Sequence, residues 1–393
     1  MNNSWNNNNK NNLTQWLLNQ KVDSWIDINI NNTTSEAEVI LWLPNSYWRP
    51  NLKPNRIKFE HDKIVSDFLN HFSDLWYLTQ KPVSINSWID DTVYFIWAPI
   101  SVLKPYITSK NIPQEWICIS QECIRTRNTK ELFNDDNIPK WWSCFTWMAV
   151  LVPLLKWEEL LKDSMNFLLK ILNIPLDNIK IQINSEDLDL KELLNIVKCP
   201  IEQIENEKED KYYTHKYWMW KIVGRNFNFV LREKWTDNFN DIWNFIIIED
   251  GDWKYWIELA LWVSVIMKEL YELDHIMDTS TITNYIPEKN IFYTKLKDSI
   301  VSSVLLFRLW IKPNASNTKG RIFRSYLRWI LYFCNKFNIS EELLFSIVQK
   351  YELEEFNENT WSWNFIIEYI KKSKNDLFVK KWKLSKEESF LIN

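Results

Sequence analysis

Three arginines in the C-terminal part of the chain, Arg321, Arg324 and Arg328, are separated by three and four residues. In a helix, this spacing places them on one face. Such a basic stripe suits the phosphate backbone of a nucleic acid, although a solvated helix face has the same pattern. A fourth arginine, Arg125, ends the run ISQECIR. Its guanidinium offers the paired donors that suit a phosphate, and it equally fits a surface position that closes a strand.

Other chemistries have weaker signals. The four histidines and five cysteines show no metal-ligand spacing, so the sequence predicts no metal site. His215 lies just before a segment that we interpret as glycine-rich, and it could line a pocket, although a lone histidine is more often structural. The sequence has neither a P-loop nor a GxGxxG pattern, which disfavours a Rossmann-type nucleotide site.

The composition is that of a globular protein. Of 393 residues, 46% are hydrophobic and 25% are charged, and the formal net charge is -4. The length suggests two or three domains. Because the sequence has no apolar run of about 18 residues and no apolar signal core, we expect neither a membrane span nor secretion. Scattered cysteines without a Cys-x-x-Cys pair favour reduced thiols and a cytoplasmic location.

The balance of tryptophan and glycine is abnormal. The chain has 25 tryptophans and 3 glycines, whereas a typical composition of about 7% glycine would give roughly 27 glycines. Many tryptophans stand where turns favour glycine, as in residues 47–50, 234–237 and 252–254. We therefore interpret most of them as glycines, encoded by UGA in a genome that reads this codon as glycine. The alternative is a truly tryptophan-rich protein.

Hydrophobic periodicity predicts a mixed α+β domain at 56–285 and an all-helical domain at 286–393, after an Asn-rich variable extension at 1–55. The predicted strands are 92–96, 117–119, 144–152, 226–232 and 242–249. The predicted helices are 57–76, which ends at Trp76 as a C-cap, 157–173, 262–273, and those from 292 onward, with breaks near Pro313 and Asn338.

Several segments resemble alanyl-tRNA synthetases. Residues 120–125 (SQECIR) resemble the Ser-Gln-x-Cys-Ile-Arg segment that is motif 2 of these class II enzymes. Residues 90–105 resemble the preceding Asp-Pro-Thr-Leu-Leu-Phe-Thr-Asn-Ala and Phe-Lys-Pro segments, and residues 143–148 resemble Thr-Phe-Phe-Glu-Met. Residues 241–244 (DIWN) resemble Glu-Ile-Trp-Asn. The matches follow the family's order over about residues 56–350. They imply a class II antiparallel sheet flanked by helices, followed by a helical tRNA-recognition domain.

The resemblance also implies roles for single residues. Arg125 would be the catalytic arginine that holds the α-phosphate of ATP, and Phe145 would stack on adenine. Glu258 would take the place of the family's aspartate, which pairs with the α-amino group of alanine. Trp243, the best candidate for a genuine tryptophan, and Asn244 would complete the alanine site. ATP would bring Mg²⁺ with it, held mostly by phosphate and water.

The sequence departs from the family in motif 3. Residues 258–265 stand where the family has Asp-Thr-Gly-Met-Gly-Leu-Glu-Arg, so Val265 replaces the arginine that meets the γ-phosphate. Loss of one such contact in a transition state costs about 2.7–4 kcal/mol. Arg232 or Lys268 could compensate. Thr146 replaces the family's glutamate, which puts one contact with adenine in doubt.

Residues 298–300 resemble the family's Asp-His-Ile-Arg segment, which implies that Asp298 begins a helix. Residues 309–328 resemble the loop and helix with which the family recognises the tRNA acceptor stem. The family's asparagine, which helps to read a G·U pair, is matched best by Asn317, with Asn314 as an alternative. Lys319 and the arginine stripe would contact the same RNA, whose A-form helix is read mainly from its shallow minor groove. The implied partners are tRNA(Ala), alanine and ATP, with neither DNA nor a membrane.

Two functions remain open. The first is an alanine–tRNA ligase that forms alanyl-adenylate from ATP and alanine and transfers the alanyl group to the 3′ end of tRNA. The second is a catalytically inactive or repurposed paralogue that binds tRNA or an aminoacyl adenylate. Residues 218–224 stand where the family has a Gly-Pro-Cys-Gly-Pro-Cys loop, but the Pro-Cys pairs are absent. This absence and Val265 favour the second function, whereas the intact DIWN run and the basic stripe favour the first. The family's editing and C-terminal domains have no match, so we expect both to be absent.

Overall fold

A computed structural model describes seven stretches of the chain. They are residues 51–109, 116–126, 142–206, 212–217, 219–233, 236–250 and 255–379. Most of the extension predicted at 1–55 therefore lies outside the described residues, as do Trp48, Trp235 and Trp253 of the turn-like segments.

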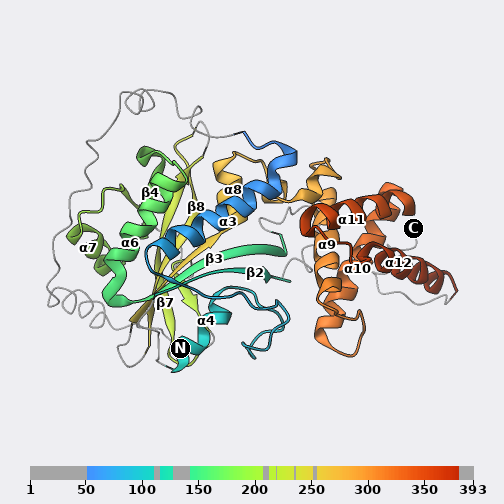
Figure 1. The fold of residues 1–393 in the computed structure, drawn as a ribbon, viewed down its shortest axis with the longest axis horizontal. Helices are drawn as coiled ribbons and strands as arrows, with labels where there is room; N and C mark the ends of the chain where they lie inside the picture. The colour runs from blue at the N-terminus through green and yellow to red at the C-terminus, as the bar shows by residue number, and fades with distance from the viewer. Residues whose placement is uncertain are drawn as a thin grey trace.

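A large, mainly antiparallel sheet forms the centre of the described structure (Figure 1). Its strand order is β1-β2-β3-β9-β8-β7-β4-β5, and β6 also pairs with β7. The strands are β1 (Leu78–Thr79), β2 (Ile117–Ile124), β3 (Cys144–Pro153), β4 (Ile179–Asn184), β5 (Gln203–Asn206), β6 (Thr214–Lys216), β7 (Val223–Arg232), β8 (Phe239–Glu249) and β9 (Tyr255–Trp262). Only the β1–β2 and β4–β5 pairs are parallel among these neighbours.

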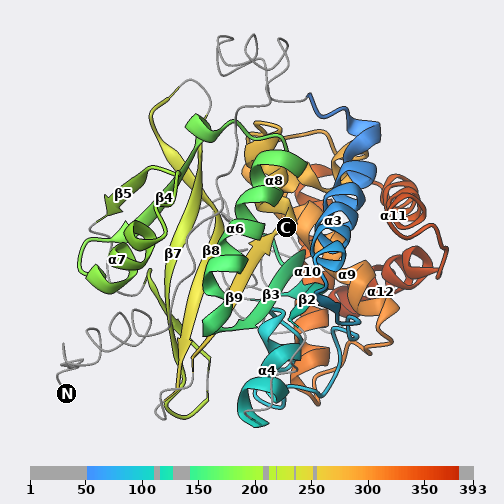
Figure 2. The ribbon, with the colours of Figure 1, turned by 60° about the vertical axis from the view of Figure 1, so that its left-hand side comes forward.

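Helices flank the sheet and continue into a helical bundle at one end of the molecule (Figure 1). They are α3 (Ile57–Asp74), α4 (Ile100–Ser109), α6 (Trp157–Asn166), α7 (Leu188–Ile196), α8 (Val263–Leu270), α9 (Ile291–Arg308), α10 (Thr318–Phe337), α11 (Glu341–Phe356) and α12 (Ser362–Val379). We call α9–α12 the helical bundle. Figure 2 shows α3, α6 and α8 together on one side of the sheet. No helix in the described stretches is both long and apolar enough to cross a membrane.

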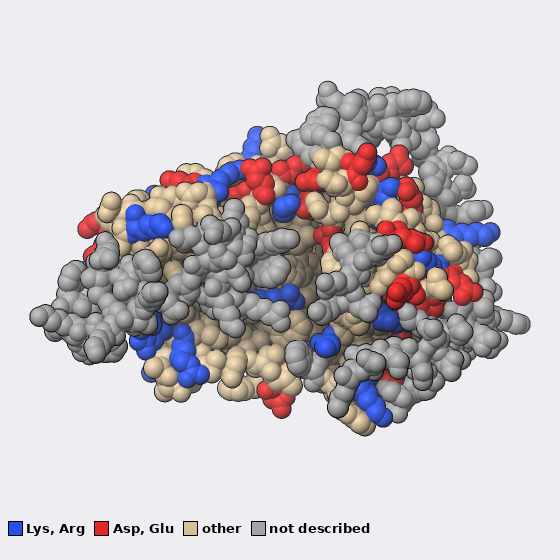
Figure 3. Space-filling model, turned by 180° about the vertical axis from the view of Figure 1, so that it is seen from behind, with Lys and Arg blue, Asp and Glu red and all other residues tan. Residues whose placement is uncertain are grey.

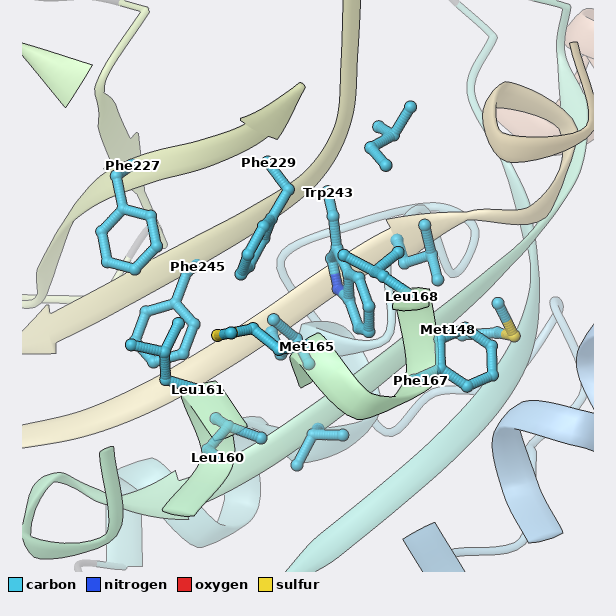
Figure 4. Packing of buried hydrophobic residues seen from close by; sticks show 14 of the residues in the cluster. Met148, Leu160, Leu161, Met165, Phe167, Leu168, Phe227, Phe229, Trp243 and Phe245 are labelled. Atoms are coloured by element: carbon cyan, nitrogen blue, oxygen red, sulfur yellow. The ribbon is translucent and has the colours of Figure 1, made fainter. Parts of the chain in front are cut away.

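An apolar core fills the space between the sheet and α3, α6 and α8 (Figure 4). Trp243 of β8 lies in this core with only 1% of its surface exposed. Its ring centroid lies 6.4 Å from that of Phe68, 5.7 Å from Phe167 and 6.0 Å from Phe229. Because neighbouring side chains of a strand point to opposite faces, the residues beside Trp243 are directed toward the other side of the sheet.

The core of the helical bundle extends into the sheet. Ile124 of β2 and Cys144 of β3 belong to the same buried cluster as Ile300 of α9 and Leu327 of α10. The sheet and the bundle therefore share apolar packing across the predicted boundary at residues 285–286. This shared core fixes where the ends of β2 and β3 lie relative to α9 and α10.

Most elements predicted by periodicity are present, and two expectations were wrong. Residues 92–96 form turns instead of a strand, because Asp90 accepts hydrogen bonds from both the backbone N–H and the hydroxyl of Thr92. An ion pair of 2.8 Å between Asp90 and Lys104 fixes this turn against α4. Asp298, expected at the start of a helix, lies in the middle of α9.

Three tryptophans in the described stretches have left-handed backbone. Trp76 follows α3 with φ 67°, Trp310 follows α9 with φ 57°, and Trp361 precedes α12 with φ 66°. At Trp76 and Trp310, two N–H groups bond back to the last helical turn in the Schellman pattern, whose left-handed position glycine usually occupies. These two side chains are 91% and 87% exposed. The geometry favours the interpretation of both residues as glycines.

Glycine at position 76 or 310 is therefore expected to raise the free energy of unfolding by about 1 kcal/mol. A Cβ atom costs roughly 1–2 kcal/mol in left-handed backbone, and the freedom of glycine in the unfolded chain offsets part of this gain. The matched control is Trp329→Gly in α10, whose buried indole should make the same change cost about 3 kcal/mol. Urea unfolding measures all three variants. Destabilisation by both Trp76→Gly and Trp310→Gly would contradict the glycine interpretation there.

Candidate active site

The sheet face opposite α3, α6 and α8 gathers the side chains predicted to do chemistry, and we call it the site face. On β9, Glu258 and Ala260 lie on this face, and Asn244 of β8 is the register partner of Ala260. Phe145 of β3 belongs to the buried cluster on the same face, which α4 closes at one end. Arg125 follows β2 directly. Side chains from β3, β8, β9 and the residue after β2 therefore meet on one face of the sheet.

Arg125 is held in a cage of aromatic rings. Its backbone N–H donates to the carbonyl of Ser143 at 2.8 Å, which continues the β2–β3 pairing by one residue. The guanidinium carbon lies near four ring centroids, at 5.0 Å from Trp97, 5.6 Å from Phe145, 4.8 Å from Trp147 and 4.7 Å from Trp262. Cation–π attraction of this kind helps to hold the guanidinium in place, and its Nε–H also donates to the carbonyl oxygen of Trp97 at 3.4 Å.

The indole of Trp262 occupies the face of Phe145. The two rings are stacked, with centroids 4.5 Å apart and planes inclined by 18°. The ring of Trp147 meets Trp262 edge-on at 5.2 Å. The buried indole N–H groups of Trp97 and Trp147 have no hydrogen-bond partner in the described structure. The place that the resemblance assigns to adenine is thus filled by Trp262, which we interpret as a glycine, as we do Trp97.

Glu258 is a buried carboxyl group under a tyrosine. It is 3% exposed, and the hydroxyl of Tyr217 donates to it at 2.8 Å. Burial raises the pKa of Glu258 to about 7, and the hydrogen bond from Tyr217 opposes this shift. A Cβ atom on Gly224 would lie 2.7 Å from Ile246 and 3.0 Å from Tyr217, so glycine is needed there for Tyr217 to reach Glu258. The site offers a carboxyl group poised to ionise when a cation binds.

The pKa of Glu258 predicts a pH dependence of stability. Between pH 4.5, its ordinary pKa, and pH 7, the folded chain keeps the proton that the unfolded chain has lost, so stability falls as pH rises through this window. The expected loss is on the order of 3 kcal/mol. We expect Glu258→Gln, which can still accept from Tyr217, to lack this loss in urea unfolding at pH 5 and pH 7.5. Equal pH dependence in both proteins would contradict the assignment.

His215, which the sequence suggested could line a pocket, lies beside Arg125 in a polar row with two amides, Asn226 and Asn228, that were not predicted from the sequence. His215 of β6 hydrogen-bonds Asn226 at 3.0 Å, and the amide of Asn226 donates to Asn228 at 2.5 Å. Burial lowers the pKa of His215 to about 4, the hydrogen bond to Asn226 opposes this shift, and the charge of Arg125 adds to it. His215 therefore faces the site as a neutral imidazole. The alternation of asparagine with aromatic residues at 226–229 was the available signal for these two amides.

Several predicted residues lie away from the site face. Trp243 is packed in the core on the other face, so the expectation that it contacts alanine was wrong. Thr146 also points to that side, where its hydroxyl lies 3.1 Å from His61. Arg232 and Lys268, either of which could have compensated for the missing motif 3 arginine, are engaged elsewhere, since Arg232 pairs with Asp237 and Lys268 pairs with Glu269. The distances are 2.6 and 2.7 Å. Val265 packs against the same core as Trp243.

The loop before α10 uses its polar groups for its own structure. The side-chain oxygen of Asn317 caps α10 by accepting from the N–H of Gly320 at 2.7 Å. Asn314 accepts from the backbone N–H groups of Ser316 and Asn317. Lys319, expected to contact RNA, lies 4.3 Å from the ring centroid of Trp88 and is half-buried, so it joins the bundle to the 84–97 loop.

The three predicted arginines do lie on one helix, α10. Arg321 is exposed and donates to Thr318 at 2.8 Å, whereas Arg324 and Arg328 are half-buried. Figure 3 shows basic side chains gathered over the lower end of the helical bundle, at the left of that view, and acidic ones along the upper edge. The bundle thus presents basic groups near the start of α10.

Comparisons with known proteins give a distant likeness of shape. No family model and no curated protein matches this sequence. Similar solved structures include the RNA-binding domain of a threonyl-tRNA synthetase from Cryptosporidium parvum, with 10% identity, coverage of 58% of this chain and 68% of that chain, and a TM-score of 0.39. The histidyl-tRNA synthetase of S. aureus has 10% identity, coverage of 58% and 73%, and a TM-score of 0.37. The asparaginyl-tRNA synthetase of Entamoeba histolytica with asparaginyl-adenylate has 10% identity, coverage of 65% and 73%, and a TM-score of 0.39. At such low values the function is inferred from this chain's own residues.

Proposed function

We propose that this chain is a class II aminoacyl-tRNA synthetase that attaches alanine to tRNA. The observation that carries the proposal is the convergence of Arg125, Phe145 and Glu258 on one face of an antiparallel sheet. They come from the segments that resemble motif 2 and motif 3 of alanyl-tRNA synthetases. The choice of alanine rests on that resemblance. A carboxyl group such as Glu258, a phosphate-binding arginine such as Arg125 and an aromatic ring such as Phe145 would suit the activation of any amino acid.

In this function, Arg125 would bind the α-phosphate and stabilise the charge that develops on it. A carboxylate oxygen of alanine attacks the α-phosphorus, and the bond to pyrophosphate breaks as the new P–O bond forms. Ionised Glu258 would hold the ammonium group of alanine during this step. The 3′-terminal hydroxyl of tRNA then attacks the carbonyl carbon and AMP leaves. Holding both substrates in register accounts for most of the acceleration in such reactions.

Mg²⁺ would enter with ATP and neutralise the pyrophosphate as it leaves. The described residues contain no cluster of three or more His, Cys, Asp or Glu side chains that could hold a metal ion. Phosphate oxygens and water would therefore supply most of the ligands, as is usual for a nucleotide-bound magnesium ion.

A specific observation favours the second function, a non-catalytic tRNA-binding paralogue. As the sequence stands, Trp262 covers Phe145, and Val265 brings no positive charge to the site. If Trp262 is a genuine tryptophan, ATP has to displace its stacked ring from Phe145 before adenine can bind there. The basic groups of α10 do not depend on this slot, so tRNA binding would survive the loss of catalysis.

Aminoacylation separates the two functions. We define the glycine-restored chain as the full-length protein with glycine at Trp76, Trp97, Trp262, Trp310 and Trp361. Given a tRNA(Ala) transcript, ATP and radiolabelled alanine, it is expected to yield labelled tRNA. Tight binding of the transcript without label transfer, from a chain that unfolds cooperatively, would instead support the non-catalytic function.

A further inference from the structure

Ser143, the residue just before β3, is bonded to both the nucleotide site and the helical bundle. Its carbonyl accepts the backbone N–H of Arg125 at 2.8 Å. Its own N–H and hydroxyl both donate to the carboxylate of Asp298, in the middle of α9, at 2.8 Å each. The hydroxyl of Tyr326 on α10 donates to the Ser143 hydroxyl oxygen, also at 2.8 Å.

These groups are closed off from water. Ser143 and Tyr326 are fully buried, and Asp298 is almost so. A hydrogen bond to a buried carboxylate is stronger than one between neutral groups, and breaking one leaves a partner without compensation. The Cys144 thiol, 3.4 Å from the hydroxyl of Ser302 on α9, adds a second contact next to the first. The beginning of β3 is therefore held to the bundle by directional bonds as well as by apolar packing.

Through Ser143, these bonds connect the proposed site residues on the sheet with α10. Phe145, the predicted adenine platform, is two residues further along β3, and Arg125 is bonded across the strand pair. On the other side, Tyr326 lies between Arg324 and Arg328 in sequence, on the helix expected to contact RNA. A small rotation of α10 would move the Tyr326 hydroxyl, and Ser143 would transmit the shift to both site residues.

We propose that Asp298 and Tyr326 are positioning residues for Arg125 and Phe145, acting through Ser143, and that they couple RNA binding on α10 to ATP binding on the sheet. The coupling rests on the proposed function. In thermodynamic terms, RNA would change the affinity for ATP, and ATP would change the affinity for RNA by the same factor. Such couplings typically lie in a range of about 5- to 150-fold.

Tyr326→Phe is the sharpest test, because it removes one hydroxyl and leaves the ring in place. The matched control is Tyr285→Phe, which removes a hydroxyl bonded at 2.6 Å to Glu354 within the bundle and without contact to Ser143. In the full-length glycine-restored chain, we expect Tyr326→Phe to raise the KM for ATP about threefold to tenfold. Asp298→Asn should raise it further, and Tyr285→Phe should not change it.

The coupling itself is measured with an acceptor-stem RNA hairpin. Saturating hairpin should change the KM for ATP at least about fivefold in the parent and in Tyr285→Phe, but less than twofold in Tyr326→Phe. A merely structural role of Tyr326 would leave this ratio unchanged. An equal response to the hairpin in Tyr326→Phe and Tyr285→Phe would overturn the proposal.

Hydrogen exchange gives a readout that needs no activity. Because the N–H of Arg125 is bonded to the Ser143 carbonyl, its exchange should be faster in Tyr326→Phe and Asp298→Asn than in Tyr285→Phe. Unchanged exchange in both variants would refute the positioning role by itself. The parent protein could fail to use ATP while the Arg125 amide still exchanges faster in Tyr326→Phe and Asp298→Asn. That result would refute the proposed function and the coupling, but it would support the positioning of Arg125 through Ser143.

Discussion

Glycine in place of both Trp97 and Trp262 is expected to increase the affinity for ATP on the order of 100-fold. The indole of Trp262 is stacked on Phe145 at 4.5 Å, so a purine that binds there must first displace it. Stacking of a base on an aromatic side chain is worth about 1–3 kcal/mol, and the same ring cannot stack twice on one face. Trp97 covers the guanidinium of Arg125, so its removal exposes the donors that a phosphate needs.

Calorimetric titration with ATP measures this change. Trp256→Gly is the matched control, since Trp256 lies on the same strand and face but outside the ring cage of Arg125. We expect it to lower stability without improving ATP binding. Equal affinity for ATP in the unmodified chain and in the Trp97→Gly, Trp262→Gly double variant would rule out the adenine slot on Phe145.

Arg125→Ala should reduce the rate of adenylate formation by at least 10²- to 10³-fold, the loss usual for a single donor aimed at developing charge. The effect should be larger than usual, because neither Val265 nor the paired Arg232 and Lys268 supply a second cation. Arg125→Lys keeps the charge but loses the planar fork, so we expect only partial activity.

Arg56→Ala is the control for this series. Arg56 is an exposed arginine paired with Glu60 at 2.8 Å at the start of α3, and its loss should leave the rate unchanged. Single-turnover kinetics at saturating ATP separate the chemical step from binding. A rate for Arg125→Ala within a factor of ten of the parent would remove Arg125 from the catalytic role.

Many helices and strands could be predicted from the sequence, because the hydrophobic patterns that indicate them are local. The near-continuous apolar run of β3 predicts a strand that is buried on both faces, and the amphipathic period of α10 places three arginines on one side. Glycine-like positions at Trp76 and Trp310 could be found because helix ends require left-handed backbone.

The site was only partly accessible, because the face to which a side chain points depends on strand register. Trp243 matched the family segment but falls on the face under α6, while its neighbour Asn244 falls on the site face. Tyr217 reaches Glu258 across the sheet, a contact between residues far apart in sequence. The bonds that join Asp298 and Tyr326 to Ser143 are equally distant, and no periodicity indicates them.

The measurement that tests the central claim most directly is ATP–pyrophosphate exchange by the glycine-restored chain with each of the twenty amino acids in turn. We expect exchange that depends on alanine, that the other amino acids support weakly or not at all, and that disappears in Arg125→Ala. Exchange with an amino acid other than alanine would support a synthetase activity and refute the proposed specificity for alanine. No exchange with any amino acid, from a folded chain that binds ATP, would contradict the account.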